Sequence, residues 1–173
     1  MNKIKVLLRI LQAYLKPDQY IRNIGVKCNG KVTMYCNPYK VFGSEPWLIT
    51  LGDNVYITSG VRFITHDGGT LILRKEIPDL EITKPIKVGD DVYFGLNCMV
   101  MPGIKIGNRC IIAAGSVVTK DIPDNSVVAG VPAKIIKSTD AYLQKIEKES
   151  LHLGNLSSVE KARELKKIYH VNE

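Results

Sequence analysis

The chain has 173 residues, of which 45% are apolar and 24% are charged. This is the composition of an ordinary folded domain and excludes general disorder. The net charge of +7 favours an anionic partner. Because no helix-turn-helix, zinc-finger or aromatic RNA-binding motif accompanies it, nucleic acid is set aside, and a lipid surface or a phosphorylated small molecule remains.

Residues 2–16 carry apolar side chains at helical spacing, so we expect an N-terminal helical cap over residues 1–22. Lysines and an arginine interrupt this run, which lacks the apolar core and cleavage site of a signal peptide. No run reaches the ~18 apolar residues of a membrane span. We therefore expect a cytoplasmic protein whose helix packs on the open end of the next domain. Peripheral membrane contact through residues 2–16 is the less favoured alternative.

A six-residue period dominates residues 88–123. Every sixth residue from Val88 is apolar, and the position four residues further on also avoids charge. The two sets are Val88, Phe94, Val100, Ile106, Ile112 and Val118, and Val92, Cys98, Ile104, Cys110, Ser116 and Ile122. A period of six fits neither a helix nor a hairpin meander, and predicts short strands that stack as a parallel β-helix. Sharp corners are expected at Gly52-Asp53-Asn54, Gly89-Asp90-Asp91 and Gly107-Asn108.

The same register appears in residues 51–63 and then lapses. Residues 64–87 contain glycines and prolines that break it, so we expect a loop inserted between coils. Loops on rigid scaffolds are where function concentrates. His66 lies at the root of this loop, followed by Asp67-Gly68, a dipeptide suited to a tight hairpin turn. His66 is therefore either part of a turn or the reactive group of an enzyme.

A metal centre has weak support. The four cysteines have no C-x-x-C spacing and are interpreted as small buried thiols of a reducing compartment. A γ-type carbonic anhydrase would need His66, His152 and His170 at one zinc ion. The last two lie in a tail, residues 138–173, that is expected to be helical and broken near Gly154-Asn155. We predict no metal.

Residues 88–137 resemble the C-terminal coils of the hexapeptide-repeat acyltransferases, and the string AAGSVVTKDIPDNSVVAGVPAKII is specific to that group. The group includes galactoside, maltose, serine, xenobiotic and polysaccharide acetyltransferases. The resemblance implies a mainly β fold: a left-handed parallel β-helix over residues 23–137, with an inserted loop at 64–87 and N- and C-terminal helices. It also implies a homotrimer that holds acetyl-CoA, the cosubstrate, in grooves between adjacent prisms.

The resemblance also assigns roles to single residues. His66 would be the general base that takes a proton from the acceptor, and the backbone N–H of Leu96 would stabilise the oxyanion. The cofactor-binding residues would be Gly95, Ala113, Ala114, Thr119, Lys120, Pro132, Lys134 and Lys137. We assign Asn37, Glu45 and Tyr93 to the acceptor; Tyr93 stands where many relatives have tryptophan. Asp67 is not expected to orient His66, because neighbours in an extended segment point to opposite sides.

These assignments predict an acetyl-CoA-dependent O-acetyltransferase that acts by direct transfer on a hydroxyl of a sugar or of a cell-surface polysaccharide precursor. Within enzymes, the alternatives are an N-acetyltransferase and a xenobiotic acetyltransferase that modifies streptogramin or chloramphenicol. Outside enzymes, the alternative is a non-catalytic β-helix assembly subunit. That subunit would need neither the loop histidine nor the C-terminal string.

Overall fold

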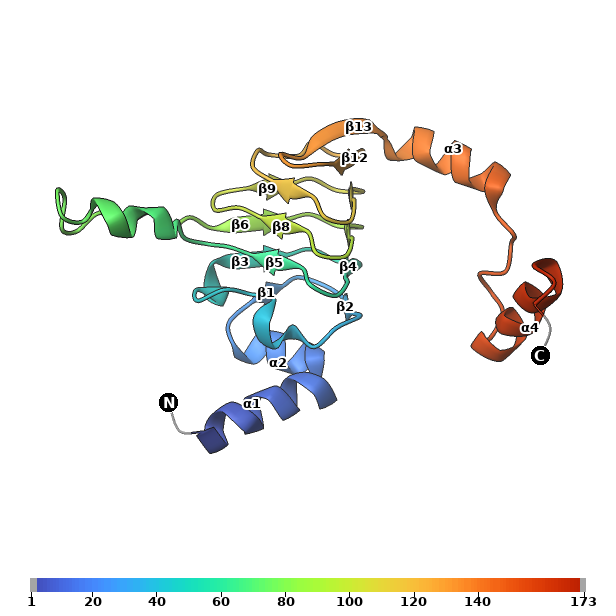
Figure 1. Ribbon diagram of the computed structural model, residues 1–173, viewed down its shortest axis with the longest axis horizontal. Coiled ribbons are helices and arrows are strands. Elements are labelled where there is room, and N and C mark those ends of the chain that lie inside the picture. Colours follow the sequence, from blue (N-terminus) through green and yellow to red (C-terminus); the bar gives the residue numbers. More distant parts are fainter. Residues whose placement is uncertain (1–2, 172–173) are drawn as a thin grey trace. The chain divides into compact units, whose positions relative to one another are not determined.

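Three sheets, here called A, B and C, are built by strands that recur in turn along the chain (Figure 1). The computed structural model describes residues 3–171. Sheet A contains β1 (Lys27–Cys28), β3 (Ile49–Leu51), β6 (Ile86–Val88) and β9 (Lys105–Ile106). Sheet B contains β2 (Val32–Met34), β4 (Val55–Ile57), β7 (Tyr93–Phe94), β10 (Ile111–Ile112), β12 (Ser126–Ala129) and β13 (Lys134–Ser138). Sheet C contains β5 (Arg62–Phe63), β8 (Met99–Val100) and β11 (Val117–Val118).

Each coil of the chain visits the three sheets once. Strands β3, β4 and β5 form one coil, β6, β7 and β8 the next, and each strand pairs in parallel with its equivalent in the following coil. Phe94, for example, is in register with Ile57 in the coil before it and Ile112 in the coil after it. The predicted arrangement of short parallel strands joined by corners is therefore present.

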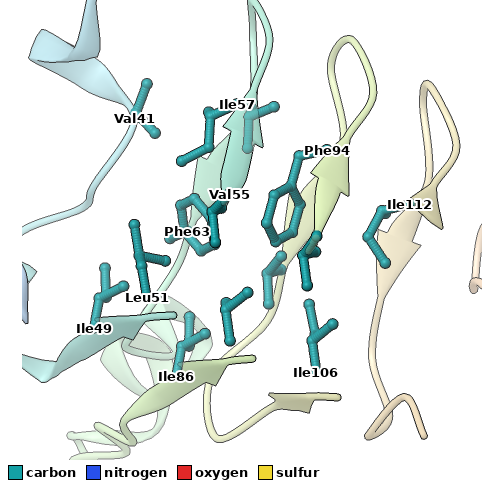
Figure 2. Close-up of a cluster of buried hydrophobic side chains, with 14 of the residues drawn as sticks. Val41, Ile49, Leu51, Val55, Ile57, Phe63, Ile86, Phe94, Ile106 and Ile112 are labelled. Atoms are coloured by element: carbon teal, nitrogen blue, oxygen red, sulfur yellow. The ribbon is translucent and has the colours of Figure 1, made fainter. Parts of the chain in front are cut away.

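The core is a column of apolar side chains inside the coils. Both sets of six-residue positions are buried, none with more than 6% of its surface exposed. Figure 2 shows Phe63, Phe94 and Ile112 in this interior. The ring of Phe63 stacks on Phe42 at 5.3 Å and meets Phe94 edge-on at 5.1 Å between centroids. Burial of one such side chain contributes about 1.5–3 kcal/mol to the free energy of folding. The stacked coils therefore supply much of the hydrophobic stabilisation of the protein.

The corners between sheets A and B also repeat. Asn54, Asp91, Arg109 and Asn125 occupy them with φ between 54° and 57°. The N–H of Asp91 donates to the carbonyl of Asp53, and later coils repeat this contact. Asparagine and aspartate tolerate left-handed backbone better than most residues, which explains three of the four residues; Arg109 is the exception.

The chain leaves the coils between β5 and β6, where the insertion was expected, and returns at Ile86 (Figure 1). A 3-10 helix, η3 (Gly68–Leu73), begins this segment. The Asp67 carboxylate accepts the N–H of Gly69 at 2.8 Å and caps η3. Asp67-Gly68 therefore starts a helix and does not form a hairpin turn. The root is closed by an antiparallel bridge between His66 and Thr83.

Helices α1 (Lys3–Leu15) and α2 (Pro17–Asn23) and the 3-10 helices η1 (Pro38–Lys40) and η2 (Pro46–Leu48) belong to the N-terminal part. Helix α1 contacts α2 and η1. Among the described side chains of α1, however, only Ala13 is buried, and the leucines are exposed. Helix α1 therefore packs on the rest of the unit through a narrow strip around Ala13, and its leucines take no part in this packing.

The chain divides into two units, Met1–Asp140 and Ala141–Glu173. Helix α3 (Thr139–Glu149) starts at the end of the first unit, and α4 (Ser158–Ile168) follows. The hydroxyl of Ser157 accepts the N–H of Glu160, and the Glu160 carboxylate accepts the N–H of Ser157, which completes a capping box. The expected break and the second helix start are confirmed. No helix within residues 3–171 has the length and apolar character needed to cross a membrane.

Candidate active site

His66 is held at the root of the insertion by a carboxylate. Its Nδ1 lies 2.9 Å from Oε2 of Glu45, and the side chains are 39% and 23% exposed. The hydroxyl of Thr65 donates to the same oxygen at 2.5 Å. Glu45 reaches this point because the segment before it runs beside β5, where the N–H of Gly43 donates to the carbonyl of Phe63.

The hydrogen bonds to Glu45 decide its charge. Burial would raise the pKa of this carboxyl, but the bonds from Thr65 and His66 and the attraction of His66 lower the pKa from its ordinary value. Glu45 is therefore ionised at neutral pH, and its Oε2 accepts a hydrogen bond from Nδ1–H of the imidazole. In the neutral ring, Nε2 then keeps its lone pair. The pair is a base in a defined orientation.

This arrangement changes the interpretation of Glu45. From the sequence, Glu45 was assigned to the acceptor; the structure places its carboxylate on His66. No local pattern could have indicated the contact, because the two residues lie in irregular segments that only the coil brings together. The carboxylate of Asp67 accepts the N–H of Gly69 and caps η3, so, as expected, it is Glu45 and not Asp67 that orients the imidazole.

A second cluster lies at the edge between sheets B and C, called the BC edge, which consists of residues 95–97, 113–115 and 130–132. The N–H of Gly95 donates to the carbonyl of Ile112 at 2.8 Å, and the N–H of Gly115 donates to that of Leu96 at 2.7 Å. A Cβ on Gly95 would lie 2.5 Å from the nitrogen of Ala114, so only glycine fits. Within residues 3–171 no acceptor is bonded to the N–H of Leu96.

The BC edge brings together Gly95, Leu96, Ala113, Ala114 and Pro132, five of the residues predicted for the cofactor and the oxyanion. The edge between sheets C and A, called the CA edge, consists of residues 64–66, 101–103 and 119–120. His66, Thr119 and Lys120 lie on this edge, with His66 after β5 and the other two after β11, two coils further on. Lys134 and Lys137 lie on β13, next to Ala129 and Val127 of β12.

His66 and Leu96 lie at opposite ends of the strands of sheet C. The N–H of Asn97, which follows Leu96, donates to the carbonyl of Ser59, and the chain then runs through β5 to His66. At about 3.3 Å per extended residue, that path covers roughly 20 Å. The two groups therefore do not meet at one reacting atom within a single chain.

The three acceptor candidates are not brought together. Glu45 binds His66, as described. Asn37 caps η1 by accepting the N–H of Tyr39, and its amide donates to the carbonyl of Ile10. Tyr93 stands on the outer face of sheet B, in a groove of about 440 Å³ that Tyr35 and Tyr56 also line.

A hollow that the sequence did not indicate lies beside Glu45. It has a volume of about 670 Å³, and Ser44 and Pro46, the neighbours of Glu45, are among its lining residues. Its other lining residues include Arg9, Tyr20, Tyr39 and Trp47. These residues come from α1, α2, η1 and η2, where no repeat predicted the fold.

Two polar residues at inward positions are structural. Burial raises the pKa of the Cys98 thiol to about 12, so it does not supply a thiolate. The buried hydroxyl of Ser116 accepts the N–H of Gly130. Within the described part of the chain, no three His, Cys, Asp or Glu side chains gather as a metal site would require.

Stacked coils of three six-residue repeats each, with a histidine at the root of an inserted loop, are the features of an acyltransferase built on hexapeptide repeats. A family model described as the hexapeptide repeat of succinyl-transferase matches residues 85–120. The chain is 42% identical over 169 residues to Protein CapG of Staphylococcus aureus, which covers 98% of this chain and 95% of that protein. The chain therefore belongs to the hexapeptide-repeat acetyltransferase family.

Two further relatives are galactoside acetyltransferases. The Escherichia coli K12 galactoside O-acetyltransferase is 39% identical over 94 residues, which are 54% of this chain and 45% of that enzyme, so the match spans about half of its length. A solved galactoside acetyltransferase in complex with coenzyme A is 23% identical, with a TM-score of 0.55 and 82% of each chain covered. The solved structure shows that the fold is shared.

Proposed function

We propose that the protein is an acetyl-CoA-dependent O-acetyltransferase that acts on a hydroxyl of a sugar or of a cell-surface polysaccharide precursor. The observation that carries the proposal is the hydrogen bond between His66 and Glu45 at the root of the insertion. It leaves Nε2 of a half-exposed imidazole as a base. The kinship with galactoside acetyltransferases supports acetyl-CoA and a sugar as the two substrates.

The chemistry is a direct transfer. Nε2 of His66 takes the proton of the acceptor hydroxyl as its oxygen attacks the thioester carbonyl, and Glu45 stabilises the imidazolium that forms. The N–H of Leu96 donates to the oxyanion. When the tetrahedral intermediate collapses, the bond to sulfur breaks and the imidazolium returns its proton to the leaving thiolate. The products are the acetyl ester and CoA, with no acyl-enzyme.

The separation of the two edges bears on assembly. Since His66 and Leu96 lie at opposite ends of sheet C, a complete site takes one group from each of two chains. A homotrimer of left-handed prisms, as the family resemblance implies, would provide three such sites between neighbouring chains. We expect the active enzyme to sediment as a trimer.

The cofactor would lie along the two edges. The small residues Gly95, Ala113 and Ala114 let a pantetheine arm approach the backbone of the BC edge. Thr119, Lys120 and Pro132 would flank its far end, and Lys134 and Lys137 would attract the phosphates. The acceptor hydroxyl would approach the exposed part of the His66 imidazole. The hollow lined by Ser44, Pro46 and Trp47, which neither Glu45 nor His66 lines, would hold a more distant part of a sugar, on which an aromatic side chain can stack. Tyr93 and Asn37 lie away from His66 of their own chain, so they would contact the acceptor only in the site of a neighbouring chain.

The test is the release of free thiol from acetyl-CoA in the presence of galactosides, maltose, nucleotide sugars, amino sugars, chloramphenicol and a streptogramin. We expect thiol release with at least one hydroxylated sugar and an ester product by mass spectrometry. An amide product would favour N-acetylation, and transfer to a drug alone would favour the xenobiotic alternative. Binding of acetyl-CoA without transfer to any acceptor would favour a non-catalytic role.

A further inference from the structure

Helix α1 points its apolar side chains away from the rest of the unit. Ala13 is 1% exposed and faces inward, whereas five large apolar side chains are at least half exposed. These are Leu7 at 66%, Leu8 at 58%, Leu11 at 50%, Tyr14 at 74% and Leu15 at 65%. At about 100° per residue, they fall on one continuous face of the helix. A helix on a water-exposed surface normally turns such a face to the core, so α1 is inverted.

The charge of this segment is of one sign. Residues 1–17 contain Lys3, Lys5, Arg9 and Lys16 and no acidic residue. Arg9 and Gln12 line the hollow beside Glu45, on the inner side of α1. The helix therefore presents apolar side chains outward and carries only positive charge.

We propose that α1 binds an anionic lipid surface, lying in its plane with the leucine face in the headgroup region. An interfacial helix has a wide apolar face, basic residues beside it and a length too short to span. Thirteen residues of α-helix, from Lys3 to Leu15, are about 20 Å long, well below the ~30 Å of a bilayer core. The helix therefore lies on a membrane and does not cross it.

Charge favours a lipid surface over a second copy of this face. Two copies that packed leucine to leucine would bring together two segments that each carry four cations and no acidic residue over residues 1–17, and like charges repel. An anionic leaflet instead attracts such a segment. The inference does not rest on the proposed function. It does place the hollow, lined by the inner side of α1, within about one helix diameter of the lipid.

The experiment is cosedimentation of the full chain with vesicles of phosphatidylcholine alone and of phosphatidylcholine with 30% phosphatidylglycerol. We expect binding to the anionic vesicles at least tenfold tighter than to the neutral ones, and weaker in high salt. The double variant Leu7→Glu/Leu11→Glu should lose at least tenfold of that binding. Its matched control is Leu71→Glu/Ile72→Glu, an equal charge change at exposed apolar residues of the insertion, which should bind like the wild type.

Four results would overturn the inference: no binding of the wild type to anionic vesicles, equal loss in both double variants, no loss in either, or dissociation of the oligomer in the α1 variant, which would make this face an interface between copies. Melting curves check that both variants are folded. A third variant, Tyr14→Trp, adds a second tryptophan to the native Trp47, and its fluorescence on anionic vesicles should shift further to the blue than that of the wild type. Acetyl transfer to a water-soluble acceptor should be unchanged in the α1 variant, so its absence from the wild type would count against the proposed function alone.

Discussion

The two edges of sheet C are built from different materials. The BC edge consists of stacked corners in which backbone N–H and carbonyl groups make the contacts, as in the bond from Gly115 to Leu96. At the CA edge, the proposed base is a side chain, His66, and a second side chain, Glu45, holds it. The repeated corners hold the backbone groups of the BC edge in place. The imidazole of His66, in contrast, is held by Glu45, a residue that does not belong to the six-residue repeat. Substitutions should therefore act differently at the two edges.

The largest effect is expected at His66. His66→Ala removes the proposed base and should lower turnover by roughly 10² or more, the scale of lost general-base catalysis. Steady-state thiol release measures it. Acetyl-CoA affinity should stay close to the wild-type value, because the proposed contacts to pantetheine and the phosphates are made by other residues, such as Gly95, Ala114 and Lys134. Turnover within threefold of the wild type would show that His66 has only a structural role at the root of the insertion.

At the BC edge, the sensitive position is Gly95. In Gly95→Ala the new Cβ would lie 2.5 Å from the nitrogen of Ala114, and backbone cannot yield cheaply. We expect a destabilisation of about 1–3 kcal/mol, seen as a lower melting temperature, and weaker acetyl-CoA binding by calorimetry. Gly68→Ala, where a Cβ meets nothing within 4 Å, is the matched control and should melt like the wild type.

Glu45→Gln should have a smaller effect on catalysis, about tenfold in kcat with KM for acetyl-CoA unchanged, because the amide keeps the shape and loses the charge. The stability difference should also depend on pH. The folded-state pKa of Glu45 is lowered below 4.5, so its ionised form stabilises the fold above that pH, and the contribution disappears as the pH falls through the folded pKa.

Melting curves of the wild type and Glu45→Gln from pH 7 to pH 3 would measure this. The difference in melting temperature between the two proteins should be largest at neutral pH and should disappear in acid. A gap that widened in acid would mean that Glu45 is not held as a carboxylate by Thr65 and His66.

The smallest effect is expected for Leu96→Ala. Its side chain is exposed, and the proposed donor is its backbone N–H, which the substitution leaves in place. Turnover within about twofold of the wild type is the expected outcome. A loss comparable to that of His66→Ala would mean that the leucine side chain contacts a substrate, and the two edges would then differ less than proposed.

The sequence predicted the coils well because their pattern is local. Each inward position, such as Phe94 or Ile112, repeats at a fixed interval, and burial at that interval is what a stacked coil requires. The six-residue period also located the insertion by its interruption. The predicted break near Gly154-Asn155 also depends on local sequence, and the capping box of Ser157 and Glu160 that starts α4 lies just after it.

The parts that sequence reasoning missed depend on contacts between irregular segments. Glu45 meets His66 only because residues 41–43 run beside β5, and no spacing rule encodes that path. The hollow lined by Trp47 and Tyr20 has the same origin. The orientation of α1 was also missed, since its apolar spacing predicts a helix face and does not say which way that face points.

The last strand has a consequence for the molecule in solution. A stack of parallel coils ends in a row of unpaired backbone groups, to which another chain could add indefinitely. In sheet B, β13 turns back and pairs antiparallel with β12, with a register shift between Val127 and Val128. Its outer edge carries Lys134 and Lys137, and charged, irregular edges disfavour strand addition. The strand proposed to attract CoA phosphates thus also protects the protein from growing into a fibre.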